Sequence, residues 1–147
     1  MTFNIEFMQE AINIAKTSGK DIPIGAVIVK DGEIIARAVN EREKEQNAVN
    51  HAEIVAIQKA NKKLNNWRLN DCEMYVTLEP CPMCASAILQ ARISKVYFGA
   101  YDMLNGAMGS KSDMRKIMNL DIEVKGGIME DECTNLLKTF FASLRKK

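Results

Sequence analysis

Several features that would assign this chain to a broad class of protein are missing from its sequence. No apolar run approaches the roughly 18 residues that a membrane-spanning helix needs. Residues 1–6 have neither a basic region nor an apolar core, so we expect no secretory signal and a cytoplasmic protein. The net charge is only +1, from 20 basic and 19 acidic residues. That balance argues against nonspecific coating of nucleic acid, although a local basic patch for one nucleic-acid segment stays possible.

The sequence also has no repeats, low-complexity segments or linkers, so its organisation must be inferred from the order of helical and strand patterns. Its 147 residues are enough for one domain with a real core, so residues 1–147 are expected to form a single unit. The expected helices lie at 7–15, 51–62, 82–91 and 133–144, and the expected strands at 24–29, 34–39, 74–78, 96–99 and 122–124. An Asp31-Gly32 turn joins the first two strands, and 101–110 is a loop. This alternation predicts an α/β fold with helices on both faces of one sheet, and the apolar stripe of the last helix is assigned to the core.

Cysteine and histidine are scarce, with four and one in the chain. Four cysteines allow two disulfides, but a Cys-x-x-Cys pair without a secretory signal is more often metal-binding or redox-active. The pair is Cys81 and Cys84, and the only histidine, His51, lies upstream in His-Ala-Glu. Three protein ligands on zinc leave a fourth position for water, which is the arrangement of catalytic sites. His51, Cys81 and Cys84 therefore predict one catalytic zinc ion.

Glu53, two residues after the histidine, distinguishes catalysis from a structural metal site. A structural zinc site has no use for a carboxylate there, whereas a deaminase needs one to carry protons. His-x-Glu with Pro-Cys-x-x-Cys is an established signature of zinc-dependent deaminases. The pattern predicts hydrolytic deamination without a redox cofactor. Zinc-bound water, its pKa lowered to about 7, attacks an amidine-like carbon as hydroxide, and Glu53 shuttles protons to the ring and the departing amine.

The predicted helices explain why these residue types suit their positions. His51 and Cys81 both precede a helix, and the electropositive N-terminus of a helix favours thiolate over thiol. If Cys84 lies one turn into its helix, it faces the same side as Cys81, so both sulfurs can share one metal.

Other interpretations of these residues stay open at this point. Cys81 and Cys84 alone would suit a thioredoxin-like redox pair, although the upstream histidine favours zinc. A zinc-stabilised binding module without catalysis would need a fourth ligand, for which only Cys72 or Cys133 offers a thiolate. We expect these two as buried apolar fillers. A deaminase of a free base or nucleoside, guanine deaminase above all, would share every zinc residue and Glu53.

The match to known sequences is broader than the zinc motif. The chain resembles the bacterial tRNA adenosine deaminases, which convert the wobble adenosine (position 34) of an anticodon to inosine. The matching segments are 22–27, Asn40, 51–53, 67–69, 75–81, Asp102 with 106–110, and 136–141. The zinc motif is shared with cytidine and guanine deaminases, whereas Thr-Leu-Glu-Pro-Cys, Gly-Ala-x-Gly-Ser and the terminal Phe-Phe are more selective.

The resemblance carries further expectations. It implies a three-layer α/β/α, cytidine-deaminase-like fold with a central five-stranded mixed sheet, and a homodimer with one zinc ion per subunit. Zinc hydroxide would attack C6 of an adenine flipped out of the tRNA anticodon stem-loop. Asn40 would contact the target nucleoside, and Asp102 and Phe140 would hold neighbouring nucleotides. Ile24 and Leu78 complete the expected substrate-binding residues.

Two departures from the family pattern lie outside the zinc ligands and Glu53. Asn50 stands before His51 where the family usually has alanine, which would alter the edge of the pocket. The stretch between Ser110 and Ile122 is slightly shorter than usual and lacks a histidine near Asn119. The nearby Lys111, Arg115 and Lys116 are candidates for phosphate contacts, with a solvated helix face as the alternative.

Overall fold

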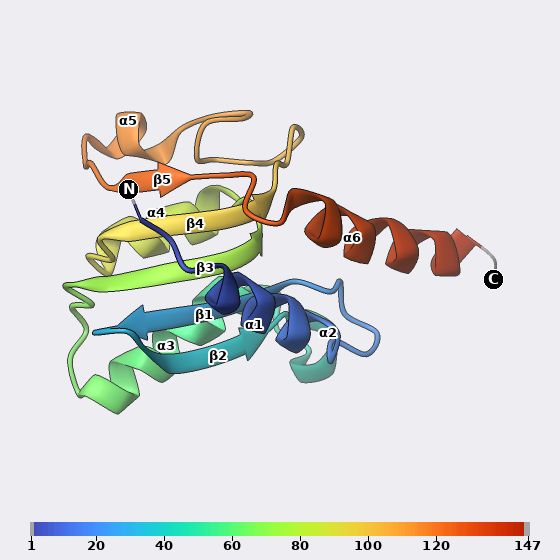
Figure 1. Cartoon of the computed structure of the whole chain (residues 1–147), viewed down its shortest axis with the longest axis horizontal. Coiled ribbons are helices and arrows are strands. Elements are labelled where there is room, and N and C mark those ends of the chain that lie inside the picture. Colours follow the sequence, from blue (N-terminus) through green and yellow to red (C-terminus); the bar gives the residue numbers. More distant parts are fainter. Residues whose placement is uncertain (1, 146–147) are drawn as a thin grey trace.

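One mixed sheet lies at the centre of the computed structural model, which describes residues 2–145 (Figure 1). Its strands are β1 (Gly25–Lys30), β2 (Glu33–Val39), β3 (Cys72–Leu78), β4 (Lys95–Ala100) and β5 (Glu123–Lys125). The strand order is β2-β1-β3-β4-β5. β1 runs antiparallel to both of its neighbours, whereas β3, β4 and β5 run parallel to one another. The expected five-stranded mixed sheet is therefore confirmed.

Helices cover both faces of this sheet, as the alternating pattern predicted. The helices are α1 (Ile5–Ala15), α2 (Arg42–Glu45), α3 (Ala52–Leu64), α4 (Pro82–Gln90), α5 (Met114–Met118) and α6 (Glu130–Arg145). Side chains alternate along β1, so Val27 and Val29 pack with α1 while Ala26 and Ile28 pack with α3 and α4. The result is the three-layer α/β/α arrangement (Figure 1).

The connections between strands and helices bring His51 and Cys81 to the same edge of the sheet. Parallel strands need a crossover, and α4 supplies it between β3 and β4. The segment after β3 therefore turns at the carboxyl edge of the sheet and enters α4 there. α3 precedes β3 in the chain and runs back across the sheet, so its N-terminus lies at the same edge (Figure 1).

The β1–β2 hairpin follows the sequence prediction. Lys30 pairs with Glu33 across a two-residue turn. Asp31 and Gly32 both have positive φ, at 52° and 76°. That left-handed backbone matches the twist of the flanking strands, which is why Asp-Gly is favoured in such turns.

The assignment of the whole α6 stripe to the core was wrong. Of α6, only Cys133 is buried, while Phe141 and Leu144 are 40% and 48% exposed. The helix starts against β4 and then runs outward past the sheet (Figure 1). A 3-4 spacing shows that a helix has an apolar side but not what covers that side. Across residues 2–145, no helix is both long and apolar enough to cross a bilayer.

Candidate active site and metal centre

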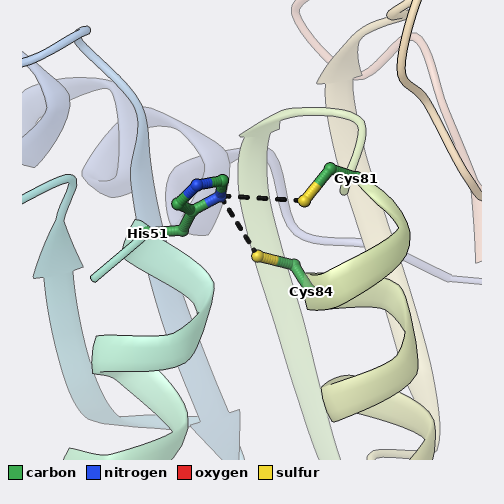
Figure 2. A group of neighbouring side chains, drawn as sticks. All are labelled: His51, Cys81 and Cys84. Carbon is green, nitrogen blue, oxygen red and sulfur yellow. Dashed lines mark hydrogen bonds between the residues drawn. The ribbon is translucent and has the colours of Figure 1, made fainter. Parts of the chain in front are cut away.

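The two sequence motifs occupy equivalent positions at the starts of two helices. His51 is the N-cap residue of α3, and Cys81 is the N-cap residue of α4, with Pro82 in the first turn. Neither cap side chain makes a capping hydrogen bond at the start of its helix. Both side chains are therefore free to point into the space between the helices, where Cys84 joins them from the first turn of α4 (Figure 2).

The geometry of this cluster fits zinc. His51 Nδ1 lies 3.7 Å from Cys81 Sγ and 3.5 Å from Cys84 Sγ. All three atoms lie within 4.8 Å of one another. Tetrahedral zinc, with bonds of about 2.0 Å to nitrogen and about 2.3 Å to sulfur, holds these atoms about 3.6 Å apart. One nitrogen and two sulfurs are also the donor types that zinc prefers, so His51, Cys81 and Cys84 would hold the ion.

Hydrogen bonding within the cluster prepares Cys81 as a ligand. The contacts from Cys84 and then His51 lower the pKa of Cys81 to about 4, against the opposing effect of burial. The same contact with Cys81, together with burial, raises the pKa of Cys84. Hydrogen bonding to Cys81 raises the pKa of His51. Metal binding requires deprotonated thiols and neutral imidazole, so zinc affinity must fall as protons compete for these ligands at low pH.

Glu53 lies in the first turn of α3, next to the cluster, and is only 4% exposed. Burial is the main cause that raises its pKa to about 7. A carboxyl group that titrates near neutrality both accepts and returns a proton readily, which suits a proton carrier. Its Oε1 atom has no hydrogen-bond partner among residues 2–145.

Asn40 carries the second buried acceptor without a partner in the described chain, its Oδ1 atom. The residue follows β2, and its backbone N–H donates to Ile24 O at 3.0 Å. The next residue, Glu41, donates to Asn50 O at 2.9 Å, which ties this segment to the residue before His51. Buried polar atoms are normally paired, so an unpaired acceptor at the zinc edge suits a group that bonds to a ligand.

The other predicted substrate contacts are distributed more widely. Ile24 and Leu78 are half-buried at strand ends, on opposite faces of the sheet. Asp102 follows β4, and its backbone N–H donates to the side chain of Glu79. Phe140 instead lines a groove of about 520 Å³ between α6 and α1, where Ile12 lies opposite. Their roles toward a substrate stay predictions.

The remaining sequence interpretations have clear outcomes. Cys72 and Cys133 are buried among apolar side chains, which confirms them as apolar fillers, and all four thiols are free in the structure. Arg115 donates to Asp113 at 2.8 Å, which weakens its candidacy as a free phosphate contact. Lys111 and Lys116 are exposed.

Two buried carboxylates hold loop segments in place, and the sequence analysis did not recognise this role. Asp21 accepts from the backbone of Glu43 and Lys44 and so fixes the segment between β2 and α3. Glu79 is 2% exposed and accepts four hydrogen bonds from the segment after β4. Acidic residues are mostly exposed, so sequence alone does not indicate their burial.

Comparison with known proteins agrees with this site. The family of the cytidine and deoxycytidylate deaminase zinc-binding region matches residues 1–100. The tRNA-specific adenosine deaminase of Bacillus subtilis (strain 168) is 47% identical over 151 aligned residues, which cover 100% of this chain and 94% of that protein.

Two solved structures are also similar. One, described in studies of A-to-I editing by tRNA:A34 deaminases at the wobble position, has a TM-score of 0.84 and 38% identity, covering 91% of this chain and 100% of the other. The other, a guanine deaminase from Bacillus subtilis, has a TM-score of 0.66 and 37% identity, covering 80% and 76%. With its zinc-fitting cluster and near-complete alignment, this chain belongs to the tRNA-specific adenosine deaminase family of zinc-dependent deaminases.

Proposed function

We propose that the protein hydrolyses adenosine at the wobble position 34 of a tRNA anticodon to inosine, releasing ammonia. The observation that carries this proposal is the buried Glu53 carboxyl beside a His51–Cys81–Cys84 cluster of zinc-binding dimensions. The alignment with the Bacillus subtilis tRNA-specific adenosine deaminase supports the choice of substrate.

The roles of the residues follow from their chemistry. Zinc held by these three ligands supplies a Lewis acid that makes water nucleophilic near neutral pH. Glu53 would take one proton of the attacking water at Oε1 and deliver it to the ring nitrogen beside C6. It would then take the second proton, from the hydroxyl now bonded to C6, and give it to the departing amine, so that ammonia leaves and a carbonyl remains. Its pKa of about 7 keeps both transfers accessible at working pH. The overall change is adenosine and water to inosine and ammonia.

Recognition of the nucleoside is assigned to the unpaired acceptor of Asn40. Its buried amide oxygen would accept a hydrogen bond from the flipped-out nucleoside and so gain a partner on binding. Ile24, on the α3 and α4 face of the sheet, would line the site, and Leu78 would contribute only from the end of β3, because it packs on the opposite face. Asp102 and Phe140 would hold adjacent nucleotides.

We extend the proposal to the assembly. The chain acts as one deaminase domain spanning residues 1–147 and works as a homodimer on the anticodon stem-loop. Its similarity to bacterial tRNA-specific enzymes favours the cytoplasm as its compartment. Apolar side chains exposed on α6, including Phe141 and Leu144, are available for contact with RNA or a second subunit.

Guanine deamination is the second candidate, because a guanine deaminase structure is 37% identical over 80% of this chain. Purified zinc-loaded protein would be incubated with an anticodon stem-loop containing wobble adenosine, and separately with free adenosine, cytidine and guanine. Ammonia and inosine would be measured, with the Glu53→Gln variant as the inactive control. Inosine in the stem-loop with little turnover of the free compounds supports tRNA editing. Turnover of guanine with an untouched stem-loop would overturn it.

A further inference from the structure

Glu79, which lies between β3 and the zinc ligand Cys81, accepts hydrogen bonds from both ends of the segment 102–110. The backbone N–H of Asp102 donates to its Oε1 atom at 3.1 Å. The N–H groups of Met108 and Ser110 donate to Oε2, each at 3.1 Å, and the Ser110 hydroxyl donates to Oε1. One buried carboxylate therefore holds the beginning and the end of this segment together.

The segment, here called the 102–110 loop, has a packed base and an exposed tip. Gly106, Ala107 and Met108 are buried, whereas Met103 and Leu104 are 69% and 81% exposed. The carboxylate of Glu79 lies so close to Gly106 that a Cβ atom there would overlap its Cδ. A glycine at this position therefore allows the base of the loop to close over Glu79.

Asp102 is fixed by the same arrangement. Its side-chain Oδ1 accepts from the N–H groups of Leu104 and Asn105 at 3.1 and 3.0 Å. Its backbone N–H is hydrogen-bonded to Glu79, so the Asp102 carboxylate and the exposed tip of the loop are held in one orientation. A binding loop ordered before its ligand arrives avoids the entropic cost of ordering upon binding.

We propose that Glu79 is a positioning residue that pre-orders the 102–110 loop for contact with nucleotides flanking the target base. The inference rests on the proposed function, because it assigns the loop to RNA. The alternative is that Glu79 only positions the zinc ligands that follow it in the chain. Glu79 precedes Pro80 and Cys81, and Ala107 N donates to Pro80 O at 2.8 Å, so the experiment must separate the two roles.

The test compares Glu79→Gln with Glu73→Gln, the same chemical change at the other end of β3. Glutamine at the first position would keep the size of the side chain but turn an amide NH₂ toward a donor, so at least one loop N–H would lose its acceptor. Steady-state kinetics on the wobble-adenosine stem-loop would be measured with zinc content. For Glu79→Gln we expect KM to rise by about tenfold, with kcat within about twofold and zinc retained, because a disordered loop weakens binding. Glu73→Gln should match the wild type.

Hydrogen exchange of the amides in 102–110 provides a readout without RNA, and Glu79→Gln should exchange about tenfold faster there. If the wild type fails to act on the stem-loop, the proposed function fails while this readout still decides loop ordering. Ser110→Ala, which removes one donor and keeps the buried carboxylate, replaces Glu79→Gln if that variant does not fold, with KM raised about threefold. The proposal would be overturned if the variant left both KM and hydrogen exchange unchanged. It would also be overturned if the variant lost zinc and kcat while KM stayed unchanged, because Glu79 would then act on the zinc ligands.

Discussion

Glu53, next to the zinc-binding cluster, and Asn40, after β2, each carry a buried acceptor that has no partner within residues 2–145. Such atoms lower stability unless a ligand pairs with them, which is why we propose that both contact the substrate. The sequence identified Glu53 from its spacing to His51, but only the fold shows its burial.

Replacing Glu53 with glutamine should separate catalysis from metal binding. Glutamine retains the shape of the side chain but cannot carry a proton, so we expect kcat to fall by at least about 10²- to 10⁴-fold. Zinc content should stay near that of the wild type, because the three ligands are untouched. Single-turnover rates with metal analysis would measure both. A variant that loses zinc in parallel with activity would assign Glu53 to the metal site instead.

The free cysteines should differ sharply in reactivity. Burial raises the pKa of Cys133 to about 12, so at pH 8 almost all of this thiol is protonated and unreactive. Reaction should increase only as the pH approaches 12 or as the protein unfolds. In zinc-loaded protein at pH 8 we expect little alkylation of Cys72 or Cys133, and chelation should expose Cys81 to the reagent. Peptide mapping by mass spectrometry would locate the label, and rapid labelling of Cys133 before chelation would contradict this account.

At the scale of the elements, close packing of α1 on β1 depends on Gly25. A Cβ atom there would overlap the backbone oxygen of Ala11 and lie 2.8 Å from Ala15 N, and backbone atoms cannot move aside by changing rotamer. Gly25→Ala should lower the free energy of unfolding by about 1–3 kcal/mol.

Gly19→Ala provides a contrast for that experiment. Gly19 has φ of 63°, and a Cβ atom there would meet no other atom within 4 Å, so its substitution strains only the backbone. We expect a loss of about 1 kcal/mol there. Urea unfolding monitored by circular dichroism would measure both variants. A Gly25→Ala variant no less stable than Gly19→Ala would show that α1 shifts easily.

How well each element could be predicted depended on the length of its pattern. The hairpin turn and the four longer strands have apolar runs bounded by Gly, Asp or Pro, and the structure confirms them. α2 and α5 contain only four and five residues, too few to show a helical period. Adjacent helical positions point about 100° apart, so exposure of one of Phe140 and Phe141 was an open alternative. Periodicity could not select Phe141, because it carries no information about where α6 lies relative to the sheet.

The site shows the same division between local and distant information. The metal ligands could be predicted from their spacing and donor chemistry. Both motifs lie at helix starts, which can be recognised from local sequence. The contacts of Glu79 do not, because its partners lie 23 to 31 residues away and include three backbone N–H groups of ordinary residues. Backbone donors have no signature in a sequence.

For the whole molecule, the near-balance of charge limits how RNA is held. With a net charge of +1, binding must use a few local phosphate contacts rather than a broad positive field. Lys111 and Lys116 are exposed near the 102–110 loop, whereas Arg115 is engaged by Asp113. These two lysines are therefore the best candidates for such contacts in this region.

Salt dependence of stem-loop binding tests that assignment. Each phosphate contact to single-stranded RNA contributes about −0.7 to the slope of log K against log salt concentration. Lys111→Ala should therefore make the slope less negative by about 0.7 and weaken binding most at low salt. Lys63→Ala, at the far end of α3 and about 18 Å along that helix from His51, is the matched control and should leave the slope unchanged. Equal slopes for the wild type and Lys111→Ala would assign Lys111 to the solvated surface, because counterion release reports contacts rather than overall charge.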